Sequence, residues 1–183
     1  YIESVGGCTN SYYETLDCPA AGGNFIEVEG YNFGNIDTVV ITVGGSECVL
    51  VNSTYNESCG TTEENRVTVT CILPSGAGLY QFLTVTDTDV TISEQWLSYA
   101  IPVINSVSGC QDEDDTTVEC PRNESLYITV IGENFGATQA EIMISGLIAE
   151  SVSLTDTEYM GMEDTVAIAI LPIGSGKYQS VNV

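Results

Sequence analysis

The stretch that decides the fold is Phe25–Gly34, which reads FIEVEGYNFG. In its first half, the apolar residues Ile26 and Val28 alternate with their neighbours, which is the two-residue period of a β-strand. The stretch ends in Asn32-Phe-Gly34, which predicts a turn because glycine tolerates a positive φ. The same alternation recurs, and predicts strands, at Val39–Val43, Val67–Cys71 and Phe82–Val85.

A close copy of this stretch lies 102 residues later, at Tyr127–Gly136. Three other segments also recur, the first two with the same offset of 102 and the last with an offset of 98. They are Ile2–Cys8 with Ile104–Cys110, Cys18-Pro19 with Cys120-Pro121, and Ile72–Gln81 with Ile170–Gln179. The sequence therefore predicts two copies of one domain, residues 1–101 and 102–183.

Short alternating runs separated by Gly, Asn and Pro, without a helical period of useful length, predict an all-β fold of two tandem sandwiches. In the first copy the last predicted strand is Trp96–Ala100. In the second copy Val183 corresponds to Val85, so the counterpart of 86–100 is missing and the final strand with it. We expect either that the natural chain continues or that a neighbouring molecule supplies a strand.

The composition excludes several functions. The 183 residues include 26 acidic and 3 basic side chains and no histidine, giving a formal net charge of −23. Binding to nucleic acid or to anionic lipid requires clustered Lys and Arg, which are absent. Without histidine there is no His-based acid/base chemistry or metal site. No apolar run is long enough to insert into a membrane, and the 43% hydrophobic content in periodic runs argues against disorder.

The repeated motifs resemble the IPT/TIG family of immunoglobulin-like domains. The resemblance covers both copies and is carried by the Ser-Val-x-Gly-Cys ending at Cys8, the Cys-Pro at Cys18, the Gly-x-Asn-Phe-Gly ending at Gly34 and the Leu-Pro-x-Gly-x-Gly-x-Tyr-Gln ending at Gln81. The cysteine-bearing, sequon-bearing pattern is similar to tandem arrays on protists and algae. The resemblance implies immunoglobulin-like sandwiches with an extracellular role; it does not identify a ligand.

Seven cysteines are present. Because Cys8 and Cys18 recur together as Cys110 and Cys120, each pair is predicted to form a disulfide. The family resemblance implies a third bridge between Cys48 and Cys71. That bridge leaves Cys59 as an unpaired or intermolecular thiol, whereas the alternative, Cys48–Cys59, leaves Cys71 buried and free.

Three sequons, at Asn52, Asn56 and Asn123, predict N-linked glycans. Together with the cysteines they indicate a secreted or cell-surface protein. The acidic run Asp112–Asp115 is a candidate calcium site. It lacks the spacing of an EF-hand, and the first copy has Ser11–Glu14 at that place, so we expect a solvated loop and no cofactor other than glycans.

No nucleophile elbow, phosphate loop or histidine-based constellation is present, so we expect no enzyme. The first functional hypothesis is an extracellular structural protein, an array of such domains that forms a rod or filament by head-to-tail packing, with strand donation as one route. Its partners are other copies or neighbouring IPT domains. The alternative is the ectodomain of an adhesion or recognition receptor, and a third possibility is a calcium-dependent adhesin or carbohydrate-binding module.

Overall fold

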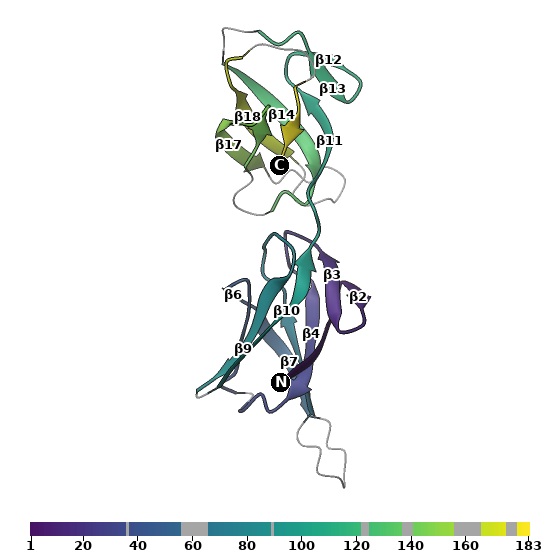
Figure 1. Ribbon diagram of the computed structural model, residues 1–183, viewed down its shortest axis with the longest axis vertical. Helices are drawn as coiled ribbons and strands as arrows, with labels where there is room; N and C mark the ends of the chain where they lie inside the picture. The colour runs from purple at the N-terminus through teal and green to yellow at the C-terminus, as the bar shows by residue number, and fades with distance from the viewer. Residues whose placement is uncertain are drawn as a thin grey trace. The chain divides into compact units, whose positions relative to one another are not determined.

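A computed structural model describes residues 1–35, 37–55, 66–88, 90–121, 125–136, 141–155, 166–174 and 179–183 (Figure 1). These residues form strands, turns and loops, and no helix, which confirms the all-β prediction. The chain divides into a first unit, Tyr1–Ile101, and a second unit, Pro102–Val183. Within the described part of the chain, no helix has the length and apolar character needed to cross a membrane.

Two sheets make up the first unit. The first has the strand order β1-β4-β8-β7 and consists of β1 (Ile2–Gly6), β4 (Phe25–Tyr31), β8 (Arg66–Ile72) and β7 (Val49–Tyr55). The second has the order β2-β3-β10-β9-β5-β6 and consists of β2 (Thr9–Ser11), β3 (Glu14–Cys18), β10 (Val90–Tyr99), β9 (Gln81–Asp87), β5 (Val40–Val43) and β6 (Ser46–Glu47).

The core of the first unit lies between these sheets. One sheet contributes Ile26 and Val28 and the other contributes Ile41 and Leu83, and all four side chains are completely buried. Alternate residues on the same strands face solvent, as the period of two requires. The predicted strands Phe25–Glu29 and Val67–Cys71 therefore lie where the sequence indicates, inside β4 and β8.

The Gly-x-Asn-Phe-Gly motif closes the end of β4 by folding a phenylalanine ring back onto the strand. Phe33 is buried, and a Cβ added at Gly30 would stand 2.6 Å from its ring. Asn32 and Gly34 both have positive φ, 57° and 84°. Asparagine and glycine are the residues that adopt this region most readily, so the motif is a compact turn fixed by its own side chain.

Asp87 at the end of β9 holds the segment that follows this motif. Its carboxylate accepts hydrogen bonds from the Thr38 hydroxyl, at 2.7 Å, and from the Asn35 N–H, at 3.2 Å. The Thr38 hydroxyl, followed by the N–H groups of Thr88 and Asn35, lowers the pKa of Asp87 below its usual value. A lowered carboxyl pKa stabilises the folded state above the unfolded pKa, and this contribution disappears as pH falls through the folded pKa.

Asp87→Asn should therefore flatten the acid limb of the stability curve of the first unit. The unfolding free energy of the wild type falls as pH drops below about 4, and the variant should lose less over that range. Urea unfolding between neutral and acid pH measures the effect. Glu47→Gln, at an exposed position, is the matched control; an equal change in both variants would contradict this role for Asp87.

In the second unit the first sheet is rebuilt in the same order, β11-β14-β18-β17. Its strands are β11 (Val103–Ser108), β14 (Leu126–Glu133), β18 (Val166–Leu171) and β17 (Glu150–Thr155). The remaining strands form a hairpin, β12 (Gln111–Glu113) with β13 (Thr116–Val118), and a three-stranded sheet, β16 (Leu147–Ile148), β15 (Met143–Ile144) and β19 (Val181–Asn182).

The two units also match in their cores. Ile128 and Val130 are buried as Ile26 and Val28 are, and Phe135 takes the place of Phe33. One difference concerns the cysteines of the first core. Ala149 and Ala169 are the buried residues at the places of Cys48 and Cys71, and the Ala149 N–H donates to Ile142 O as the Cys48 N–H donates to Ile41 O, both at 2.8 Å.

Candidate strand-acceptor site in the second unit

In the first unit, β10 joins two parts of the second sheet that are distant in sequence. It pairs antiparallel with β9, with Leu97 opposite Gln81, and parallel with β3, with Leu97 opposite Thr15. The far end is fixed by the Ala100 N–H, which donates to Cys18 O at 2.8 Å. The β2–β3 hairpin therefore belongs to this sheet only through β10.

The inward side chains of β10 complete the core. Leu97 and Tyr99 are buried, and the Tyr99 hydroxyl donates to Pro74 O at 2.8 Å. Burial raises the pKa of Tyr99 to about 12. Gly76 makes room for the ring, because a Cβ at that position would stand 2.6 Å from it. The Leu-Pro-x-Gly segment thus forms the seat of an inward-facing tyrosine.

The described part of the second unit has the two flanks of this arrangement. Its hairpin, β12 with β13, forms a separate two-stranded sheet, and β19 pairs with β15 on one side. Among the described residues no strand lies between β13 and β19. A sheet edge of this kind offers unpaired N–H and C=O groups to a further strand.

The hairpin flank is preformed. The Cys110 N–H donates to Thr117 Oγ1 at 2.8 Å, and the Gly109 N–H donates to Asp112 Oδ1 at 3.0 Å. In the first unit the Cys8 N–H donates to Thr15 Oγ1 at 2.9 Å. The hairpin is therefore held by its own hydrogen bonds and by its disulfide, with or without a strand beside it.

Residues that β10 covers in the first unit are more exposed at the corresponding places in the second. Thr15 and Cys18 are completely buried, whereas Thr117 and Cys120 are half-buried. Gly174 corresponds to Gly76. Among the described atoms, a Cβ at Gly174 would meet only Pro172 O, at 3.8 Å. The described part of the second unit thus keeps, at Gly174, the glycine that makes room for the tyrosine ring in the first unit. We call this place, between β13, β19 and Gly174, the acceptor slot.

The structure contains three disulfides: Cys8–Cys18, Cys48–Cys71 and Cys110–Cys120. The two recurring pairs are those that the repeat predicts. Cys48 is joined to Cys71, as the family resemblance implies, and the Cys48–Cys59 alternative is not formed. Cys59 itself lies outside the described residues, so its role as an unpaired or intermolecular thiol stays a prediction.

The predicted glycosylation sites are described only in part. Asn52 lies on β7, exposed to solvent and in register with Thr70 of β8. Asn56 and Asn123 lie outside the described residues. In the candidate calcium run, Asp112 caps the hairpin through the hydrogen bond from Gly109, which gives that carboxylate a structural task. The described residues contain no group of three or more carboxylate, Cys or His side chains suited to a metal.

Sequence reasoning missed part of this site. The run Asp112–Asp115, which was expected to be a solvated loop, lies in the β12–β13 hairpin, and its counterpart Ser11–Glu14 lies in the β2–β3 hairpin. The recurrence of Thr15 as Thr117, each accepting a hydrogen bond from the cysteine N–H seven residues before it, is the signal that would have indicated the hairpins.

The comparison with protein families gives one match. The model of the IPT/TIG domain matches residues 11–101, which lie in the first unit and include β3, β10 and the Gly-x-Asn-Phe-Gly turn. No curated protein matches the chain. IPT/TIG domains are immunoglobulin-like modules without enzymatic activity. Three disulfides in such a module suggest an extracellular environment.

Proposed function

Because the chain contains an IPT/TIG immunoglobulin-like domain, we propose that it is an extracellular structural module in a linear array of such domains. The array grows head to tail, and the second unit takes part by accepting a β-strand into the acceptor slot. One observation carries this proposal. The described second unit preserves both flanks of the β10 position of the first unit, which are the disulfide-fixed hairpin and the glycine seat.

The charge favours this kind of joint. The first unit has 13 acidic residues and one basic residue, and the second has 13 and two, so the units carry about −12 and −11. Two such surfaces repel each other at close range. Strand addition relies on backbone hydrogen bonds and a few inward apolar side chains, and its strength is therefore less sensitive to the charge of either partner.

The compartment that we propose is the secretory pathway and the cell exterior, with N-linked glycans at Asn52, Asn56 and Asn123. The oxidised cysteines and the exposed position of Asn52 support it. We place the protein among the cysteine-bearing, secreted IPT/TIG proteins of the protist and algal type. In this proposal it is not an enzyme and needs no metal.

A second candidate function is a receptor ectodomain, which the tip of the β2–β3 hairpin favours. Tyr12 is 99% exposed, and Tyr13 beside it packs its ring 6.2 Å from that of Trp96. An exposed aromatic residue on a supported hairpin is a suitable contact for a protein or glycan partner. Loss of partner binding after Tyr12→Ser, with assembly unchanged, would favour this function over the structural one.

A peptide tests the acceptor slot. A synthetic peptide with the sequence of 90–100, VTISEQWLSYA, should bind the disulfide-intact chain, because it carries the side chains that complete the first unit. Fluorescence anisotropy of the labelled peptide measures the affinity. In the control peptide, serine replaces the residues at the positions of Leu97 and Tyr99. Equal binding of both peptides, or binding of neither, would refute the acceptor slot.

Salt tests the electrostatic argument independently. Moving from about 0.05 M to about 0.5 M NaCl shortens the range of repulsion between the acidic units, so any linear assembly should lengthen or remain intact. Negative-stain electron microscopy and light scattering follow the length. Dissociation by moderate salt would show that ion pairs hold the assembly, contrary to this account.

A further inference from the structure

In the first unit, β10 is held by two aromatic contacts. The ring of Trp96 lies 6.2 Å from the ring of Tyr13, at the tip of the β2–β3 hairpin. The ring of Tyr99 is buried in its seat, where its hydroxyl donates to Pro74 O at 2.8 Å. A strand that binds at the corresponding place of the second unit could be recognised through either contact.

The second unit keeps the hairpin but not the aromatic residue at its tip. Asp115 corresponds to Tyr13, because the Val107 N–H donates to Asp115 O at 3.0 Å as the Val5 N–H donates to Tyr13 O at 2.8 Å. A carboxylate offers no ring for an aromatic contact. A strand beside this hairpin therefore finds no equivalent of the contact between Tyr13 and Trp96.

The seat of the tyrosine, in contrast, recurs with its hydrogen-bond acceptor. In the first unit, a Cβ added at Gly76 would stand 2.7 Å from the Tyr99 hydroxyl, which lies 2.8 Å from Pro74 O. In the second unit, a Cβ added at Gly174 would stand 3.8 Å from Pro172 O. The Leu-Pro-x-Gly segment thus places the same carbonyl acceptor beside the same glycine in both units.

We infer that the acceptor slot selects its strand by a tyrosine at the position of Tyr99, whose phenol hydroxyl donates a hydrogen bond to Pro172 O. The choice of strand rests on the proposed function, because it specifies what the second unit accepts. The occupant is defined by its chemistry: an apolar residue, then any residue, then tyrosine, as in Leu97-Ser98-Tyr99 of β10.

Burial makes the hydroxyl decisive. Tyr99 is only 2% exposed in the first unit, so a ring in this seat excludes water from the carbonyl beneath it. A phenylalanine ring would fill the same space and leave the carbonyl oxygen without a donor. A buried acceptor that loses its partner costs more free energy than the hydrogen bond itself contributes. The slot should therefore distinguish tyrosine from phenylalanine.

Two variants of the labelled 90–100 peptide test this selection, with the disulfide-intact chain and fluorescence anisotropy as the readout. The Tyr99→Phe peptide should bind with a dissociation constant about tenfold higher than that of the parent peptide, or more. The Trp96→Val peptide keeps a residue of high β-propensity and loses the aromatic ring. Its dissociation constant should change less than that of the Tyr99→Phe peptide.

The outcomes distinguish this inference from the proposed function. If the Tyr99→Phe peptide binds as tightly as the parent while the serine control peptide does not bind, the slot accepts strands but does not read the hydroxyl. If the Trp96→Val peptide loses more affinity than the Tyr99→Phe peptide, the hairpin sets the specificity, which also overturns the inference. If no peptide binds, the acceptor slot itself is refuted.

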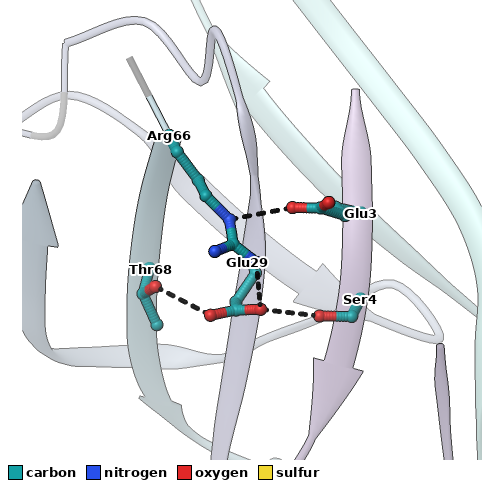
Figure 2. A network of polar contacts seen from close by, with 5 residues as sticks. All are labelled: Glu3, Ser4, Glu29, Arg66 and Thr68. Atoms are coloured by element: carbon teal, nitrogen blue, oxygen red, sulfur yellow. Dashed lines mark hydrogen bonds and ion pairs between the residues drawn. The ribbon is translucent and has the colours of Figure 1, made fainter. Parts of the chain in front are cut away.

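A further variant tests whether the peptide binds to the first unit, whose own seat also holds a tyrosine. Arg66 pairs with Glu29 at 3.0 Å and with Glu3 at 2.9 Å, and so joins β8 to β4 and β1 (Figure 2). Arg66→Gln loosens these strands and leaves every residue of the second unit unchanged. The peptide should bind this variant as it binds the wild type. Tighter binding would show that the peptide displaces β10, and would overturn the assignment to Pro172.

Discussion

Replacing both Cys48 and Cys71 by alanine should lower the unfolding free energy of the first unit by about 3 kcal/mol, with the chain-entropy model as the basis. The bridge closes 23 positions of sequence and joins the ends of β7 and β8 inside the core. Because the second unit buries Ala149 and Ala169 at these places, the variant retains a pattern that the fold already tolerates. The loss should therefore reflect the crosslink more than misfolding.

Denaturant unfolding followed by tryptophan fluorescence measures this loss. Trp96 is the single tryptophan of the chain and packs against the core of the first unit, so its signal reports that unit alone. Cys59→Ser is the matched control and should leave the midpoint unchanged. If it costs as much as the double alanine variant, Cys59 takes part in a bridge and the Cys48–Cys71 pairing is wrong.

Gly76→Val should be the most damaging single substitution at the end of the first unit, costing about 2–4 kcal/mol. A branched side chain there would displace the Tyr99 ring and break its hydrogen bond to Pro74 O. The matched substitution is Gly174→Val. A Cβ added at Gly174 would meet only Pro172 O among the described atoms, so this substitution should change the unfolding free energy of the second unit little.

The same pair of variants separates stability from binding. Gly174→Val should abolish binding of the 90–100 peptide while leaving the circular dichroism and the melting of the chain near those of the wild type. Gly76→Val should do the reverse, destabilising the first unit and leaving peptide affinity intact. If Gly174→Val binds the peptide normally, the seat of the tyrosine does not take part in strand acceptance.

Much of the fold could be predicted because its signals are local. The alternation around Ile26 and Val28 identifies the inward side of β4, and the shared offset transfers that assignment to Ile128 and Val130. β7 gave no such signal. Its register shifts between Leu50 and Asn52, so a bulge interrupts the alternation. β2, β3 and their counterparts have three to five residues each, too few to establish a period.

The candidate site, like the fold, could be predicted from the sequence only in part. The recurrence of Ile72–Gln81 as Ile170–Gln179 could be predicted, because it follows from comparing the two copies. The importance of Gly174 could not, because the role of Gly76 depends on a ring that arrives from 23 positions further along the chain.

The parallel pairing of β3 with β10 also sets a constraint on biosynthesis. Thr15 and Leu97 are 82 positions apart, so the first unit cannot close its second sheet until residue 100 has left the ribosome. During that interval the hairpin between Cys8 and Cys18 exposes a sheet edge. An early disulfide, needing only ten positions of sequence, would hold that nascent hairpin in shape while the rest of the domain is translated.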